Sequence, residues 1–331
     1  GMIELDAVNR ELLEQLQSDF PLIPGPFAAL GRAVGLDEDQ VLARVRRLKC
    51  ENVIRQIGAI FDTRRLGYES TLVAFHVQDG EMETVAALVS AHPGVSHNYA
   101  RPHHYNLWFT LAVPPGRDLL AEIRRLAGQC GVDDWLNLPA LRVFKLKTHF
   151  KLQESKTVQQ VEASGNPVRR ARAFTPADIP FVRALQRDLD IVSRPFAEAA
   201  GRLDLSEGDL LDRARELAEA GIMRRFGAVL RHRRVGFTAN GMACWVVPEA
   251  QMETIGLRCA AFPEVSHCYH RPAYPPRWRY TLFTMIHGQT SDEVESLVDE
   301  IARETGIAEN RVLYSTHEFK KERVRYFEED V

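Results

Sequence analysis

An internal repeat constrains this chain more than any other feature of its sequence. The segment Val-Ser-His-Asn-Tyr-Ala-Arg-Pro at 95–102 returns as Val-Ser-His-Cys-Tyr-His-Arg-Pro at 265–272, and each copy leads toward a strongly apolar run. A second pair of related segments, at 52–68 and 221–237, keeps its glycines at the same spacing. Because self-similarity at a long period indicates a duplicated architecture, we predict two related halves in tandem.

Composition is typical of a globular protein with several modest domains. The chain has 331 residues, 45% of them hydrophobic, and its 42 basic and 45 acidic residues give a net charge of -3. Proteins that neutralise nucleic-acid phosphates are usually strongly basic, so general affinity for nucleic acids is not expected. No apolar run reaches membrane-spanning length, and the five cysteines have no spacing typical of a disulfide framework or a zinc site. We therefore expect a cytoplasmic protein with no membrane attachment.

Each half opens with the pattern of a winged helix-turn-helix. In the first half, apolar residues at helical spacing predict helices at 5–16, 27–34 and 38–50, with Asp37 as the cap of the third. A β-rich segment then predicts a wing. The second half repeats this order, with predicted helices at 179–189, 196–201 and 206–220. Two short helices joined by a tight turn have the spacing of a helix-turn-helix.

The rest of each half predicts a ferredoxin-like domain, because the order of elements is βαββαβ. The last strand is expected near 141–146 in the first half and at 311–314 in the second. The predicted fold class is α+β, a tandem duplication of a winged helix-turn-helix and a ferredoxin-like domain. The predicted domains are 1–62 and 63–150, then a polar linker at 151–175, then 176–232 and 233–331.

The repeated histidine segments form the candidate site. A strand that is otherwise patterned for burial has no packing reason to carry so many imidazoles, and a buried polar group costs free energy unless it is bonded. A ligand held by convergent polar groups would account for the cluster. The alternative is that these residues are partly exposed and bond to the backbone.

Each half resembles the Lrp/AsnC family, in which a helix-turn-helix precedes a ferredoxin-like domain that pairs in dimers. The matching segments are LDAVNRELLEQL at 5–16, VGLDEDQVLARVRRL at 34–48 and ENVIRQIGAIF at 51–61. The His-x-Tyr-x-Arg-Pro segments, with NLWFT at 106–110 and YTLFTMIHG at 280–288, are narrower signatures. They resemble the two paralogous subunits of the siroheme decarboxylase family, fused end to end. The resemblance covers nearly the whole chain.

This resemblance implies a carboxy-lyase that removes the C12 and C18 acetate carboxyls of siroheme. The product would be 12,18-didecarboxysiroheme, for haem d1 or alternative haem synthesis, and fusion of the halves favours the former. The implied partner is a tetrapyrrole substrate, held by an intramolecular pseudo-dimer of the two halves. Homo-oligomers, or contacts with other proteins of the haem d1 pathway, remain open. No cofactor is expected, and the iron belongs to the substrate.

The implied chemistry assigns roles to the repeated side chains. Histidine can supply the proton that the remaining methylene needs, arginine can hold carboxylates, and one imidazole could instead ligate the substrate iron. The candidates for acid or iron ligand are His97, His103, His104, His267 and His270. The candidates for binding carboxylates are Tyr99, Arg101, Tyr105, Tyr269, Arg271 and Tyr274, with a basic rim of Arg64, Arg65, Arg233 and Arg234. The rim arginines have the alternative of being solvated turn residues.

The two copies are not chemically equivalent, because Ala273 and Tyr274 stand where the first copy has His103 and His104. We predict one productive pocket at the interface of the ferredoxin-like domains, built from both halves. The sequence leaves open which half supplies the reacting histidine. The sequence allows two roles for Trp108, Trp278 and Phe283: stacking on the ring of the tetrapyrrole, or filling the hydrophobic core.

The alternative function is a DNA-binding regulator of Lrp/AsnC type that responds to haem or another small ligand. A regulator presents the N-terminal turns of its recognition helix to DNA. Carboxylates at that place would be repelled by phosphates, and basic residues lie only further along the third helix, at 44–49. DNA binding is therefore not expected. The carboxylates are those of Asp37, Glu38 and Asp39 in the first half, and of Glu207, Asp209 and Asp212 in the second.

Overall fold

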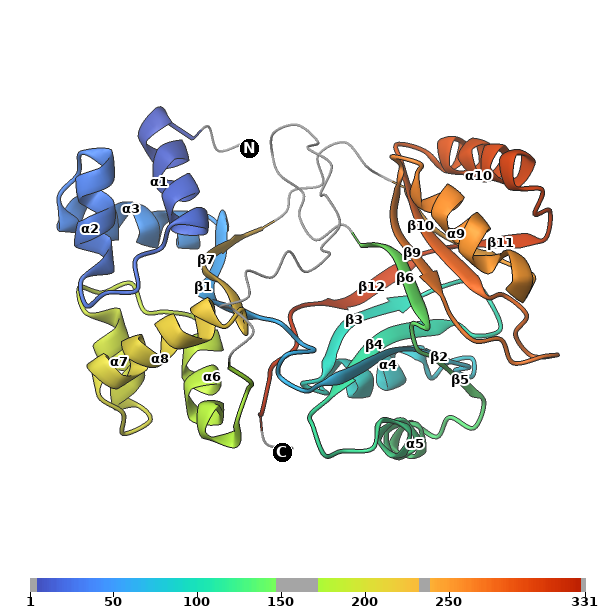
Figure 1. The fold of residues 1–331 in the computed structure, drawn as a ribbon, viewed down its shortest axis with the longest axis horizontal. Coiled ribbons are helices and arrows are strands. Elements are labelled where there is room, and N and C mark those ends of the chain that lie inside the picture. Colours follow the sequence, from blue (N-terminus) through green and yellow to red (C-terminus); the bar gives the residue numbers. More distant parts are fainter. Residues whose placement is uncertain (1–4, 147–171, 232–238, 329–331) are drawn as a thin grey trace. The chain divides into compact units, whose positions relative to one another are not determined.

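The computed structural model describes residues 5–146, 172–231 and 239–328 (Figure 1). The described residues form two compact units. Unit 1 takes them from Gly1–Tyr68, Ala163–Arg233 and Arg325–Val331, and unit 2 from Glu69–Glu162 and Arg234–Val324. Each unit therefore draws on both halves of the sequence. Nearly all of the predicted linker at 151–175 lies outside the described residues.

Unit 1 contains the two helix-turn-helix segments. The first is α1 (Ala7–Ser18), α2 (Pro26–Val34) and α3 (Glu38–Cys50); the second is the 3-10 turn η2 (Pro176–Asp178), α6 (Ile179–Gln186), α7 (Pro195–Gly201) and α8 (Glu207–Glu219). As predicted, Asp37 begins α3, in a capping box with Gln40. Ser206 begins α8 by accepting a hydrogen bond from the amide of Asp209.

The two wings are single strands that pair with each other. β1 (Ile54–Phe61) and β7 (Met223–Leu230) form an antiparallel sheet in which Gly58 lies opposite Gly227. A Cβ atom on Gly227 would lie 2.5 Å from the carbonyl oxygen of Leu16, at the end of α1. A Cβ on Gly58 would lie 3.1 Å from that of Arg187, just after α6. Each glycine therefore lets the first helix of the other half approach its strand.

Unit 2 contains two ferredoxin-like sheets. The first half supplies β2 (Glu69–Phe75), α4 (Met82–Ser90), β3 (Val95–Ala100), β4 (Leu107–Val113), α5 (Leu119–Cys130), β5 (Trp135–Leu138) and β6 (Arg142–Leu146). The second supplies β8 (Ala239–Trp245), the 3-10 turn η3 (Glu249–Gln251), α9 (Met252–Ala260), β9 (Val265–His270), β10 (Leu282–Gly288), α10 (Ser291–Thr305), β11 (Asn310–Tyr314) and β12 (His317–Lys321). The strand orders are β12-β3-β4-β2-β5 and β11-β8-β10-β9-β6. The predicted fold class is confirmed.

The last strand of each half crosses to the sheet of the other half. The prediction that 141–146 forms the fourth strand of its own sheet was wrong, because β5 takes that place and β6 pairs with β9. Reciprocally, β12 pairs with β3. The exchanged aromatics anchor the crossings: Phe319 packs against the core of the first sheet and Phe144 against that of the second. The exchange supports the predicted intramolecular pseudo-dimer.

Each sheet has two different faces. α4 and α5 cover one face of the first sheet, and α9 and α10 cover one face of the second (Figure 1). A third core brings together side chains from both sheets and from the loops after β3 and β9. Among the helices of the described residues, none is long and apolar enough to cross a bilayer. The third core consists of Ala74, Tyr105, Trp108, Leu136, Leu138, Met242, Cys244, Trp278, Phe283 and Leu313.

Candidate functional site

Two rows of polar side chains lie on the sheet faces that point away from the helices. Alternate residues of a strand share a face, so His97, Tyr99 and Arg101 form one row, here called the β3 row. The intervening Asn98 is buried on the opposite face, where its Nδ2 donates to the carbonyl of Ala86 in α4 at 3.2 Å. The equivalent β9 row is His267, Tyr269 and Arg271.

A β-bulge aims the histidine of each row. The register of β3 against β4 shifts between Val95 and Asn98, and that of β9 against β10 shifts at Ser266. Both Val265 and Cys268, three positions apart, therefore belong to the core under α9. His267 lies between them on the other face. Bulges commonly re-aim a side chain beside a functional site.

The β3 row has charged neighbours on the exchanged strand β12. Residues paired across neighbouring strands share a face, and His97 pairs with Lys321 while Tyr99 pairs with Glu318. The hydroxyl of Tyr99 donates to Oε1 of Glu318 at 3.2 Å. Burial, followed by the charge of Lys321, lowers the pKa of His97 to about 4. The imidazole of His97 is therefore neutral at pH 7, the form in which an imidazole ligates iron.

The β9 row has apolar neighbours in the same places. On β6, Leu146 pairs with His267 and Val143 pairs with Tyr269. These two side chains are 47% and 41% exposed, which is high for large apolar residues. The duplication has thus given one row an ionic border and the other a border suited to an apolar ligand.

The arginines of the rows connect the two halves. Nη1 of Arg101 donates to the carbonyl of Leu313 in β11 at 2.9 Å, and Nη1 of Arg271 donates to that of Leu138 in β5 at 2.5 Å. Within the described part of the chain, the buried Nε of each arginine has no hydrogen-bond partner. Burial lowers the pKa of Arg271 to about 10, so it stays charged at neutral pH. Carboxylate binding by these arginines stays a prediction.

A hydroxyl links two histidines in the second half. The Oγ of Ser266 lies 2.8 Å from Nδ1 of His267 and 2.5 Å from Nε2 of His287. Nδ1 of His287 lies 2.7 Å from Oδ1 of Asn240. His287 was not among the predicted site residues. The sequence did contain a signal for His287. It lies in the segment YTLFTMIHG, and the matching position of the first half holds alanine, so the histidine is specific to the second half.

The loop after β3 gathers a separate group around Asp134. This carboxylate lies 2.7 Å from Nε2 of His104 and accepts a hydrogen bond from the hydroxyl of Tyr105 at 2.8 Å. The rings of His103 and Trp278 have their centroids 5.5 Å apart. Burial, followed by the charge of Arg311, lowers the pKa of His103 to about 4. Interactions with Asp134 and Trp278 therefore hold this group in place.

Other predicted site residues are placed away from the rows. His270 alternates with Tyr269 and so shares the face of Cys268, not that of His267. The hydroxyl of Tyr274 donates to the carbonyl of Asn137. Trp108, Trp278 and Phe283 are between 1% and 3% exposed, so core filling is their role in this structure.

The predicted basic rim is only partly described. Arg64 and Arg65 are exposed residues of unit 1, where Nη1 of Arg65 donates to the carbonyl of Ala220 at 2.6 Å. Arg233 and Arg234 lie outside the described residues. The rows belong to unit 2. The rim therefore stays a prediction.

The basic residues of α3 make contacts within unit 1. Arg46 donates to the carbonyl of Ile191 at 2.8 Å, and Lys49 is paired with Asp188. Arg44 is paired with Asp6 at 3.2 Å. These bonds use side chains that a regulator would offer to DNA phosphates. They agree with α3 serving as a packing element.

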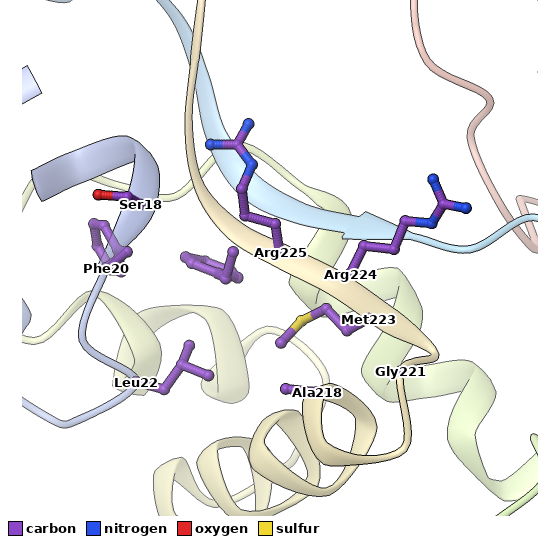
Figure 2. A pocket seen from close by; sticks show the side chains of 9 residues that line it. Ser18, Phe20, Leu22, Ala218, Gly221, Met223, Arg224 and Arg225 are labelled. Carbon is purple, nitrogen blue, oxygen red and sulfur yellow. The ribbon is translucent and has the colours of Figure 1, made fainter. Parts of the chain in front are cut away.

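A cavity of about 420 Å³ opens in unit 1, beside the end of α1 and the start of β7. Figure 2 shows Leu22, Met223 and Ala218 around it, with the guanidinium groups of Arg224 and Arg225 directed away from Leu22. None of the predicted site residues that the structure describes lines it. Its wall consists of Ser18, Phe20, Leu22, Ala218, Gly221, Met223, Arg224, Arg225 and Phe226.

Two family models match this chain, each of them twice. The model of the AsnC-like ligand binding domain matches 65–145 and 234–320, and that of the siroheme decarboxylase NirDL-like HTH domain matches 9–55 and 178–224. The siroheme decarboxylase of Hydrogenobacter thermophilus is 40% identical, over 97% of this chain and 95% of that one. The chain belongs to the siroheme decarboxylase family.

The siroheme decarboxylase family contains both fused and separate-subunit forms. The alpha subunit from Desulfovibrio desulfuricans is 44% identical over 46% of this chain and 87% of its own length. A crystal structure of the siroheme decarboxylase NirDL in co-complex with an iron-uroporphyrin III analogue is 38% identical and superposes with a TM-score of 0.73. It covers 97% of this chain and 95% of that one. The fusion and its fold are thus shared with that relative.

Proposed function

We propose that the protein removes the C12 and C18 acetate carboxyls of siroheme, using the β3 and β9 rows of unit 2. The chain is a carboxy-lyase of the siroheme decarboxylase family, and its substrate is a tetrapyrrole. One observation carries the site assignment. Each half contributes a bulged strand that presents histidine, tyrosine and arginine on the sheet face opposite its helices. The relative that was crystallised in co-complex with an iron-uroporphyrin III analogue supports a ligand of this size and charge.

The reaction determines what the protein must provide. The bond between the acetate methylene and its carboxylate breaks, carbon dioxide leaves, and the methylene takes up one proton to become a methyl group. The macrocycle can take up the electron pair of that bond when one of its ring carbons is protonated. The protein must therefore hold the ring, position its carboxylates and supply protons.

We assign different tasks to the two row histidines. The pKa of about 4 makes His97 a neutral imidazole at pH 7, and a neutral imidazole is the form that ligates iron. His267 is hydrogen-bonded through Ser266 to a second imidazole, that of His287. A histidine connected to another titratable group is better placed to deliver a proton. His97 is therefore the candidate iron ligand and His267 the candidate acid.

The borders of the rows suit different parts of a tetrapyrrole. The ring plane is apolar, and Val143 and Leu146 provide exposed apolar surface beside the β9 row. The ring edge carries carboxylates, for which Lys321 and the Nε of Arg101 are charged donors near the β3 row. We propose a single productive pocket with residues from both halves. In it, the apolar border of the β9 row contacts the ring plane and the charged border of the β3 row binds the carboxylates.

A DNA-binding regulator is the competing function. Acidic residues occupy the first turns of α3 and α8, and Arg44, Arg46 and Lys49 are engaged within unit 1. Both observations disfavour phosphate contacts. We also place the protein in the cytoplasm, in the haem d1 pathway; all five cysteines lie in the described residues and are free thiols, as a reducing compartment favours.

Anaerobic incubation of the purified protein with siroheme, followed by mass spectrometry of the tetrapyrrole, tests the function. We expect the loss of two carbon dioxide molecules, through an intermediate that has lost one. Unchanged siroheme, together with tight and sequence-dependent binding to a DNA fragment, would favour the regulator. The variants His97→Ala and His267→Ala test the assignment of the site to the two rows. Full activity in both variants would contradict that assignment.

A further inference from the structure

We propose that His287 controls, through Ser266, which ring nitrogen of His267 carries a proton, and that this makes the β9 row the proton-donating row. The inference rests on the proposed function and deepens it. It names a positioning residue for the reaction. It also says which of the two rows, whose histidine, tyrosine and arginine are the same in sequence, donates the proton.

The hydrogen bonds around His287 have one consistent direction when both imidazoles are neutral. The amide oxygen of Asn240 can only accept, so His287 donates to it from Nδ1, across 2.7 Å. Nε2 of His287 then accepts the hydroxyl hydrogen of Ser266, across 2.5 Å. The Oγ of Ser266 in turn accepts from Nδ1 of His267, across 2.8 Å. In this state Nε2 of His267 carries a lone pair.

Protonation of His287 reverses the chain. Both of its nitrogens then donate, so Ser266 accepts from Nε2 and its own hydroxyl hydrogen turns toward His267, whose Nδ1 at 2.8 Å is a nearer acceptor than the carbonyl of Met285 at 3.5 Å. The hydroxyl donates to Nδ1 of His267, which moves the ring proton of His267 to Nε2. A proton taken up at His287 thus converts His267 from an acceptor at Nε2 into a donor at the same atom.

The proton transfer balances along this path. Nε2 of His267 gives its proton to the methylene carbon from which carbon dioxide departs. Nδ1 of His267 takes the hydroxyl proton of Ser266, and Ser266 takes the proton from Nε2 of His287. The net change is one proton moved from His287 to the product, and each group returns to the neutral arrangement. No oxidant or reductant takes part.

The first half has the serine but not the second imidazole. Ser96 lies 2.9 Å from Nδ1 of His97, and its Oγ lies 2.6 Å from the hydroxyl of Thr110. A threonine hydroxyl does not titrate near neutral pH. The register places Ala112 of β4 where β10 has His287, and Thr110 where β10 has Met285. The β3 row therefore has no protonatable group in this position.

The test uses two substitutions of His287 in the full-length protein with siroheme as substrate. His287→Ala copies the first half, and His287→Gln keeps a donor near Ser266 but cannot titrate. Loss of the hydrogen-bond partner that orients a metal-ligating residue typically costs about 10- to 100-fold in activity, and we use the same scale for a partner that orients an acid. We expect both variants to lose about 10- to 100-fold in kcat, with KM near the wild-type value. His317→Ala, an exposed histidine of β12 outside both rows, is the matched control and should keep the wild-type kcat.

A second readout separates positioning from folding. With ¹⁵N-labelled histidine, the ring nitrogens of His267 should change from the Nδ1-protonated to the Nε2-protonated pattern as the wild type is acidified. The His287→Gln variant should lack this change while its unfolding midpoint stays near that of the wild type. An unchanged kcat in His287→Gln, or an unchanged ¹⁵N response, would overturn the inference.

The outcomes also separate this inference from the proposed function. Siroheme left intact by the wild type contradicts the function itself. Full activity of His267→Ala contradicts the role of His267 as the acid, and the inference with it. An inactive His267→Ala beside a fully active His287→Gln leaves the proposed function standing and rejects only the role of His287.

Discussion

Lys321 lies opposite His97 on neighbouring strands, and the equivalent pair in the other sheet is Leu146 and His267. The two histidines have the same bulge, the same serine and the same tyrosine beside them. They differ in the side chain that the exchanged strand places opposite them, which is a lysine in one sheet and a leucine in the other. An ammonium group beside a half-buried imidazole disfavours its protonation, whereas a leucine has no such effect.

Replacing Lys321 by leucine should raise the pKa of His97. Burial is the larger cause of the low value, so the pKa should rise from about 4 but stay below its ordinary value. The ring signals of His97 in an NMR titration give the pKa directly. The reciprocal Leu146→Lys is the matched variant, expected to disfavour protonation of His267. A pKa of His97 that does not move would show that Lys321 does not act on it.

The free energy of unfolding should fall as the pH drops from about 6.5 to about 4. His97 and His103 both have folded-state pKa values of about 4, so the unfolded chain binds their protons first. Protonation therefore favours unfolding across this window, and the stability is fully present above it. Because both side chains are only partly buried, we expect a loss on the order of 1 kcal/mol for each. Urea unfolding at several pH values measures it, and His97→Gln with His103→Gln should flatten the curve in this range.

Substituting either row arginine should destabilise the contact between the two sheets. Arg101→Ala leaves the buried carbonyl of Leu313 without its donor, and Arg271→Ala does the same to Leu138. Loss of such a bond typically costs about 1–3 kcal/mol. Urea unfolding compares both variants with Arg279→Ala, whose exposed guanidinium pairs with Glu309 and should contribute much less. Equal effects in all three would contradict a special role for the row arginines.

Gly227→Ala should lower the unfolding temperature of unit 1. The new Cβ would lie 2.5 Å from the carbonyl oxygen of Leu16, so α1 must move away from β7. Overpacking of this kind typically costs about 1–3 kcal/mol. Gly128→Ala, in α5, is the control because, apart from its chain neighbours and the backbone of its own helix, no described atom lies within 4 Å of the new Cβ. That variant should be neutral or stabilised by up to about 1 kcal/mol, since alanine favours a helix. Calorimetry compares the two.

An acidic residue on the apolar border of the β9 row should weaken substrate binding. Leu146→Asp places a carboxylate opposite His267, where the ring of an anionic tetrapyrrole is proposed to lie. The repulsion and the lost apolar contact should raise KM for siroheme more than they lower kcat. Leu257→Asp, an exposed apolar residue of α9 on the other side of this sheet, should leave KM unchanged. Equal KM values for the two variants would place the substrate elsewhere.

The duplication made most of the fold predictable, but not the partner of each strand. Helical spacing located α3 and its cap at Asp37, and the repeated motif located the strands that carry His97 and His267. The segment Arg142–Leu146 is a good edge strand for either sheet. Its place in the other sheet depends on packing of Phe144 against the second core, which no local pattern encodes.

The candidate site was predictable at the level of residue types and not at the level of bonds. The repeat exposed His97 and His267 because each recurs within a conspicuous motif. His287 recurs nowhere, and alternation along an apolar strand gives no sign that its ring reaches Ser266. The bulge that brings these groups together adds one residue, and a sequence pattern does not show which residue is the extra one.

The crossing of β6 and β12 makes neither ferredoxin-like sheet complete without the other half of the chain. A truncated protein ending at residue 150 would leave one edge of β3 open and β6 without a sheet, and open strand edges promote association between copies. Tethering both halves in one polypeptide keeps the local concentration of each missing strand high at any dilution of the protein. Dilution that would dissociate two separate subunits should therefore leave the fused protein assembled.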